Sequence, residues 1–174
     1  YYHVPSPLTE MYFKTAFKQG QSTDVLITAN LSPRLNYAVA YRGHRSLGHY
    51  QHSLSGVSQL RFSAWYENPN RRYRLRFKLA NQKIEQQENG GLDSLSLQNF
   101  TDKIAEFEDR ARLSVKFQNA ANLFTGKRYL LEQDYALLMT TDSVPVPALR
   151  IGHRVRTDSQ RHHFNQDSVV EELG

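Results

Sequence analysis

The chain has 174 residues, of which 39% are hydrophobic, and it carries a formal net charge of +5. No apolar run approaches the roughly 20 residues of a membrane-spanning helix, which excludes a helical membrane protein but not a membrane β-barrel, whose strands need only about ten residues with every second one apolar. The absence of cysteine excludes disulfides, cysteine-based zinc sites and thiol nucleophiles, and the positive charge favours an anionic partner or a cationic surface or lumen.

The first part of the chain alternates apolar with polar or small residues, which is the period of a strand whose two faces meet different surroundings. The clearest alternation runs over 35–42, where large apolar residues oppose asparagine, alanine and arginine. Alanines on the second face favour a barrel with a space-limited interior over a soluble sandwich, whose buried face usually carries larger apolar groups. The strands predicted in this part are 11–18, 23–31, 35–42 and 57–66.

Residues 72–79 separate their side chains completely by charge. A helix would scatter the four cations around its circumference, so the segment predicts a strand with one apolar and one cationic face. The apolar face carries Tyr73, Leu75, Phe77 and Leu79. The cationic face carries Arg72, Arg74, Arg76 and Lys78.

The remainder of the chain repeats this pattern less regularly. Apolar residues again alternate with arginine or lysine in two segments, whereas Leu130 and Gln133 interrupt the alternation of a third. The strands predicted here are 110–118, 128–138 and 149–156, with the beginning of one more at 161–166. Long loops are predicted near 43–55, 81–109 and 139–148.

The predicted connections follow a rule. Those after the second, fourth and sixth strands are short and those after the third, fifth and seventh are long, with the short first connection as the exception. Outer-membrane barrels have short turns on one rim and long loops on the other, whereas a Greek-key sandwich has no reason for such parity. The sequence therefore predicts an all-β fold, an antiparallel transmembrane β-barrel, of which residues 1–174 form one part with seven to nine strands. Because the first residues contain neither an initiator methionine nor a signal sequence, we expect a fragment of a longer chain.

The chain contains five short motifs in a characteristic order: Pro-Leu-Thr-Glu-Met-Tyr at 7–12, Asn-Leu-Ser-Pro-Arg-Leu-Asn at 30–36, Arg-Ser-Leu-Gly-His-Tyr at 45–50, Asn-Arg-Arg-Tyr at 70–73 and Glu-Asn-Gly-Gly at 88–91. In this order they resemble the putative porins of the Bacteroidetes outer membrane. The resemblance runs roughly from residue 1 to the loop near residue 90 and more loosely beyond it. It implies a transmembrane β-barrel in a bacterial outer membrane.

A lumen lined by cations is the functional hypothesis that the alternation supports. Charged groups in a pore raise the local concentration of counter-ions, so we expect passive diffusion of small anionic solutes. One alternative is a closed barrel with a structural or assembly role in a larger outer-membrane complex, in which these cations pair with lumenal carboxylates; another is a soluble, basic β-sheet binding module. The residues expected to line the pore are Arg72, Arg74, Arg76, Lys78, Arg110, Arg112, Lys116, Arg150, Arg154 and Arg156. The residues expected to face lipid are Leu35, Tyr37, Val39, Tyr41, Tyr73, Leu75, Phe77, Leu79, Leu113, Val115 and Phe117.

Other kinds of site have weaker support. A nucleic-acid platform would need aromatic residues on the same face as the cations, and those of 72–79 lie opposite. His162 and His163 lack a third ligand at a recognisable spacing. Glu132 and Asp134 share a strand face, as a catalytic pair would, but lumenal salt bridges are the preferred interpretation. We therefore expect no enzymatic activity, no cofactor and no nucleic acid, and we expect outer-membrane lipid, small solutes and other outer-membrane proteins as partners.

Overall fold

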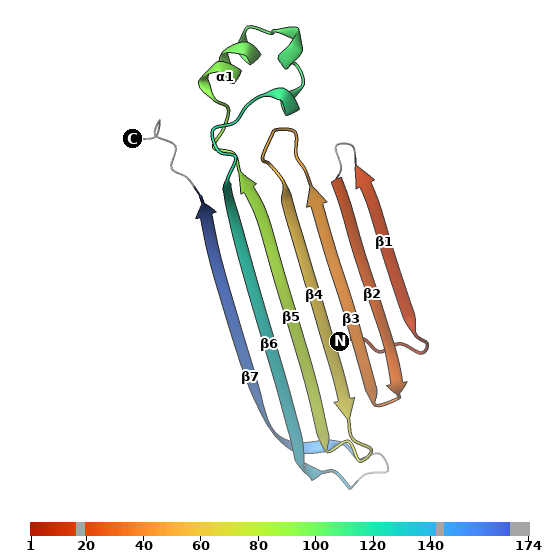
Figure 1. Cartoon of the computed structure of the whole chain (residues 1–174). Helices are drawn as coiled ribbons and strands as arrows, with labels where there is room; N and C mark the ends of the chain where they lie inside the picture. Colours follow the sequence, from red (N-terminus) through yellow and green to blue (C-terminus); the bar gives the residue numbers. More distant parts are fainter. Residues whose placement is uncertain (17–19, 142–144, 168–174) are drawn as a thin grey trace.

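The computed structural model describes residues 1–16, 20–141 and 145–167. Within these residues, seven strands form one antiparallel sheet in which each strand pairs with the next along the chain (Figure 1). No pairing joins β1 to β7 in the described residues, so the sheet is open at both edges. The strands are β1 (Leu8–Ala16), β2 (Gly20–Ser32), β3 (Leu35–Ser46), β4 (Ser55–Glu67), β5 (Tyr73–Glu88), β6 (Ala120–Met139) and β7 (Pro147–Gln166).

The two faces of the sheet differ in chemistry because the cross-strand register keeps like residues on the same side. Arg76 of β5 lies opposite Glu132 of β6, whereas the next residue, Phe77, lies opposite Leu131. Neighbouring residues on a strand point to opposite faces, so polar and apolar rows are largely separate across the sheet, with Trp65 and Leu130 as exceptions on the side of Arg76 and Lys78. We call the face that carries Arg74, Arg76 and Lys78 the cationic face. We call the face that carries Leu75, Phe77 and Leu79 the apolar face.

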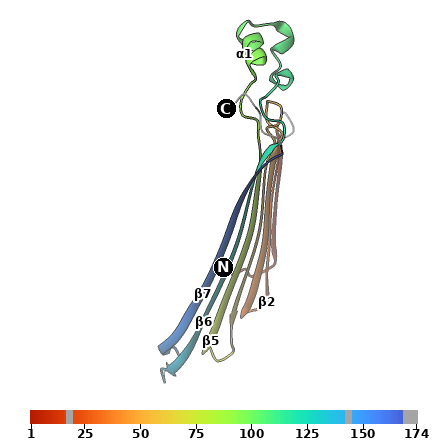
Figure 2. The ribbon, with the colours of Figure 1, turned by 60° about the vertical axis from the view of Figure 1, so that its left-hand side comes forward.

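The apolar face is uncovered. In the described part of the chain the strands contact only their neighbours in the sheet, and the turned view shows a single curved layer of strands (Figure 2). Met11 is 76% exposed and Ile151 is 61% exposed, and both lie on the apolar face. The fold class predicted from the sequence is thus confirmed as an antiparallel all-β sheet, open as a partial barrel would be.

On the apolar face the apolar side chains form a band, which is bounded by tyrosines on one side and by polar residues on the other. Near the β4–β5 turn the rings of Tyr66 and Tyr73 lie 6.4 Å apart at one edge. Along β5 the apolar residues give way at Asn81, and Lys83 follows on the same face. At about 3.3 Å per residue, Tyr73 and Asn81 are roughly 26 Å apart along the strand. Because barrel strands are tilted by about 35–45°, this length corresponds to a band roughly 20 Å tall, and its nine residues fall within the roughly 9–11 that a tilted strand needs to cross a bilayer.

The connection between β5 and β6 folds on itself beyond the end of the sheet (Figure 1). It contains the helix α1 (Ser94–Thr101) and two short 3-10 helices, η1 (Ala105–Phe107) and η2 (Arg110–Arg112). An Asp93 carboxylate oxygen accepts a 2.6 Å hydrogen bond from the Ser96 amide and caps the start of α1. No helix in the described residues is long and apolar enough to cross a membrane.

The strand predicted at 110–118 is wrong, because its alternating apolar residues form the small core of this connection. Leu113 is fully buried, and Val115 is 6% exposed and pairs with Leu92 through an isolated bridge. Phe117 packs against Gly90, where an added Cβ would meet the ring at 2.5 Å. The residues that consequently lie on neither face of the sheet are Leu113, Val115, Phe117, Arg110, Arg112 and Lys116.

The strands are also longer than predicted. β3 and β4 include the ends of the loop predicted near 43–55, β5 includes 81–88, and β7 runs through 161–166 without a break. Because 110–118 forms no strand, each connection after it lies on the rim opposite to the one predicted from the sequence. The connection within 139–148 therefore lies on the same rim as the short β2–β3 and β4–β5 turns, although it was expected on the rim of long loops (Figure 1).

Candidate functional site

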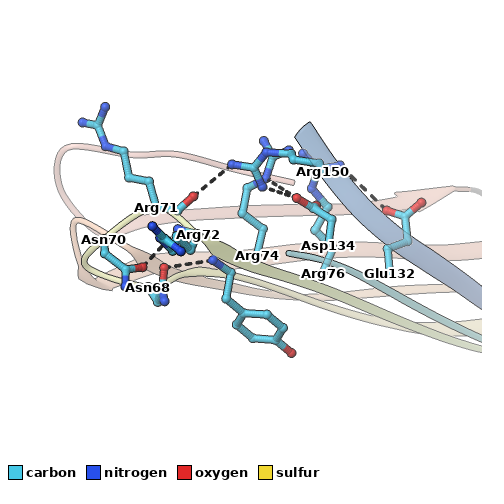
Figure 3. A network of polar contacts seen from close by, with 10 residues as sticks. Asn68, Asn70, Arg71, Arg72, Arg74, Arg76, Glu132, Asp134 and Arg150 are labelled. Carbon is cyan, nitrogen blue, oxygen red and sulfur yellow. Dashed lines mark hydrogen bonds and ion pairs between the residues drawn. The ribbon is translucent and has the colours of Figure 1, made fainter. Parts of the chain in front are cut away.

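The cationic face of β5, β6 and β7 carries ion-paired carboxylates, each between two arginines. The first is Asp134, which accepts a 2.9 Å hydrogen bond from Arg74 Nε on β5 and pairs with Arg150 on β7 (Figure 3). Arg150 also donates a 3.0 Å hydrogen bond to the carbonyl oxygen of Arg71, in the β4–β5 turn. The antiparallel register makes this arrangement, since Asp134 is the direct cross-strand partner of Arg74.

Two further carboxylates repeat the pattern farther along the strands. Glu132 lies 3.9 Å from Arg76 and 2.5 Å from Arg154, which are its direct partners on β5 and β7. The third carboxylate, on β7, pairs with a β6 arginine across the strands and with a β7 arginine two residues away. We call this set the arginine ladder. Its members are Arg74, Asp134 and Arg150; Arg76, Glu132 and Arg154; and Arg128, Asp158 and Arg156.

The arginine ladder is only half neutralised. Six guanidinium groups meet three carboxylates, which leaves three net positive charges. Two of the three carboxylates, Glu132 and Asp158, are less exposed than both of their partners: the Glu132 side chain is 18% exposed, whereas that of Arg154 is 71% exposed. An ion that approaches these two parts of the ladder from the cationic side therefore meets guanidinium groups before carboxylates.

A hollow of about 330 Å³ lies beside the ladder on the same face. Small residues of β3, β4 and β5 form its floor, because alanine and serine leave space where larger side chains would fill it. Arg61, Lys78 and Arg128 contribute cations to its lining, and Tyr2 lines it from the N-terminal segment. The small residues are Ala38, Ala40, Ser63 and Ala80.

The N-terminal segment lies against the cationic face. The Tyr1 ring centroid is 4.3 Å from Lys78 Nζ and 5.6 Å from the Arg76 guanidinium carbon. The Val4 carbonyl accepts a 2.8 Å hydrogen bond from Asn30 Nδ2 on β2. Burial raises the pKa of the Tyr1 phenol above its usual value, and the negative charge of Glu132 raises it further. The ring therefore stays neutral at ordinary pH and contributes its π-face to the cations.

A family model described as "Putative porin" matches residues 1–174. The chain belongs to this family. No curated protein and no solved structure matches the chain. The source in the Bacteroidetes remains a prediction.

In this porin-family chain the residues predicted to line a pore and those predicted to face lipid lie on opposite faces of the sheet, apart from those in the β5–β6 connection. Seven predicted pore-lining residues gather on the cationic side of β5 and β7: Arg72, immediately before β5, and Arg74, Arg76, Lys78, Arg150, Arg154 and Arg156. Eight predicted lipid-facing residues share the apolar face: Leu35, Tyr37, Val39, Tyr41, Tyr73, Leu75, Phe77 and Leu79. The three cations of the β5–β6 connection are separate from the ladder, and Arg110 instead lies over the Tyr50 ring, with its guanidinium carbon 5.8 Å from the ring centroid.

Sequence reasoning missed two of the three cations that line the hollow on the cationic face. Arg61 belongs to the polar set of its strand, together with Gln59 and Ser63, and the alternation there could have identified it. Arg128 begins the predicted strand whose pattern is interrupted at Leu130, so its face was harder to assign. Both line the hollow, and Arg61, which is not part of the ladder, extends the cationic face to β4.

Proposed function

We propose that this chain forms part of the wall of a bacterial outer-membrane channel through which small anionic solutes diffuse passively. The observation that carries the proposal is the uncovered apolar face, whose band matches the thickness of an outer membrane while the opposite face is rich in arginine. Lipid covers the apolar face and water fills the space beside the cationic face. The channel acts without enzymatic chemistry.

The arginine ladder supplies the preference for anions. Its exposed guanidinium groups raise the local anion concentration, and the paired carboxylates hold those groups in fixed positions. A partly neutralised row also suits conduction, since a site must bind an ion strongly enough to admit it and weakly enough to release it. The hollow lined by Arg61, Lys78 and Arg128 gives such a solute room beside the ladder.

Reversal potentials of the whole protein in planar bilayers under a salt gradient test this function. We expect anion preference, and we expect Arg154→Gln to reduce it, because this side chain is the most exposed cation of the ladder. Arg161→Gln is the matched control, since it removes the same charge from the same strand on the opposite face. A channel that prefers cations, or an equal change in both variants, contradicts the proposal.

A closed barrel in a larger outer-membrane complex is the second candidate. It is favoured by the N-terminal segment, because Tyr1 covers Arg76 and Lys78, and His3 lies edge-on to Trp65 with ring centroids 6.2 Å apart. Absence of conductance in wild type, with channels appearing when Tyr1, Tyr2 and His3 are replaced by glycine, would favour this candidate. A soluble binding module is disfavoured, since water would then meet the whole apolar face.

A further inference from the structure

Three neighbouring strands, β5, β6 and β7, each carry a cation on the apolar side of the sheet, at or just beyond the edge of the apolar band. Lys83 of β5 and Arg161 of β7 are both direct cross-strand partners of Thr125 on β6. Lys127 is two residues from Thr125 on the same strand and therefore points to the same side. All three side chains are exposed. They lie toward the rim from which the long β5–β6 connection extends, which in outer-membrane barrels is the extracellular rim (Figure 1).

We propose that Lys83, Lys127 and Arg161 bind the phosphorylated headgroup of a glycolipid in the outer leaflet. Strands lie about 4.8 Å apart, so the backbones of Lys83 and Arg161 are separated by roughly 10 Å with Thr125 between them, and Lys127 lies roughly 7 Å from Thr125 along β6. Long, flexible side chains on such a triangle can converge on one phosphate group. Glu85 pairs with Lys83 from the side farther from the apolar band, and the cluster keeps a net charge of +2.

A hollow of about 250 Å³ gives this cluster the shape of an amphiphile site. Tyr41, Leu60 and Lys127 belong to one cross-strand row at the edge of the apolar band, and Lys83 belongs to the next row toward the rim. Its polar lining residues on this face are Ser58, Asn81 and Thr125. An amphiphile whose acyl chain lies over Tyr41 and Leu60 and whose headgroup reaches Lys127 beside them and Lys83 one row farther toward the rim fits this arrangement.

Gly43 helps to form the boundary. An added Cβ there would lie 2.9 Å from the Tyr41 hydroxyl oxygen, so the tyrosine extends along the sheet over the glycine, toward the rim. Its ring stays with the apolar band while its hydroxyl reaches the polar side, which is the placement of tyrosine at a membrane interface. The cations thus lie at headgroup level, where a phosphate of the outer leaflet would be found.

This inference rests on the proposed membrane location of the apolar face, and it is independent of conductance. The test measures binding of lipid A to the detergent-solubilised whole protein by native mass spectrometry, with dephosphorylated lipid A and phosphatidylglycerol as comparison probes. We expect wild type to retain lipid A, and the triple variant Lys83→Gln, Lys127→Gln, Arg161→Gln to lose at least tenfold in affinity.

The matched control removes the same charge from the cationic face through Lys78→Gln, Arg154→Gln and Arg156→Gln, and it should bind lipid A as wild type does. Equal loss in both triple variants would overturn the proposal, because binding would then follow net charge alone. Equal affinity for dephosphorylated lipid A would overturn the role of phosphate, and equal affinity for phosphatidylglycerol would overturn the assignment to a glycolipid. If the triple variant does not fold, the single variant Lys127→Gln should still weaken binding, and an unchanged affinity would contradict the site.

Discussion

Ala64 and Ser63 are neighbours on β4 at the same height but on opposite faces, so replacing each with arginine tests which face meets hydrocarbon. Ala64 lies in the row of Phe77, and Ser63 lies in the row of Lys78. Neither original side chain contributes much packing that would be lost. The two variants add the same charge and the same volume, and they differ only in what surrounds the new side chain.

The register gives the expected size of the difference. Phe77 is four residues from Tyr73 and four from Asn81, so Ala64 lies about 13 Å along the strand from each edge of the band. Arginine at the bilayer midplane of a barrel costs about 2–4 kcal/mol. Arginine at position 63 extends into the hollow beside Lys78 and adds repulsion of about 1 kcal/mol in a hydrated setting. We therefore expect Ala64→Arg to be the more destabilising by roughly 1–3 kcal/mol.

Guanidinium unfolding of the whole protein in lipid vesicles measures both free energies of unfolding. Asn81→Arg serves as a depth control, because arginine near the interface costs only about 0–1 kcal/mol. Equal destabilisation at positions 63 and 64 would refute the assignment of the apolar face to lipid. A greater loss of stability in Ser63→Arg than in Ala64→Arg would indicate that the cationic face, and not the apolar face, meets lipid.

Two further predictions concern the ladder and the β5–β6 connection. Glu132→Gln removes the charge between Arg76 and Arg154, so the anion preference in bilayer recordings should increase; a shift toward cations would contradict the ladder's role. Leu113→Ala should destabilise the connection by about 2–5 kcal/mol because it leaves a cavity in its small core. Limited proteolysis should then cut the connection faster while unfolding of the barrel stays unchanged, and unchanged cleavage would show that Leu113 is not needed there.

Alternation of apolar and polar residues with a period of two correctly predicted a strand wherever each face of that strand has a single environment. Residues 72–79 could be assigned to a strand because their apolar and charged side chains alternate without exception. The register with β4 and β6 keeps the two sets on opposite faces of the sheet. Residues 110–118 have the same pattern but form no strand. Alternation shows that a segment is compatible with a strand, but it does not show whether a neighbouring strand is there to pair with it. The register places Gln133 on the apolar face, where Tyr73 Oη donates a 2.9 Å hydrogen bond to its side-chain oxygen. Such a pair satisfies a polar group locally and is invisible to pattern analysis.

The cations of the candidate site were predictable strand by strand, but their partners were not. Placing Glu132 between Arg76 and Arg154 requires the register of β6 against two strands, one of them distant in sequence. The sequence left two interpretations open, cations free in a lumen or cations paired with carboxylates. The structure combines both, since every carboxylate of the ladder is paired while half of the positive charge remains.

The β5–β6 connection has a defined conformation of its own. The Ser114 amide donates a 2.9 Å hydrogen bond to Ser96 Oγ, and the Asp93 amide donates a 3.2 Å bond to the Ser114 carbonyl, so distant parts of the connection hold one another in place. An antibody raised against this segment would consequently recognise a conformational epitope and would bind poorly to a linear peptide of the same sequence. Such an antibody could label intact cells and report which rim of the protein faces outward.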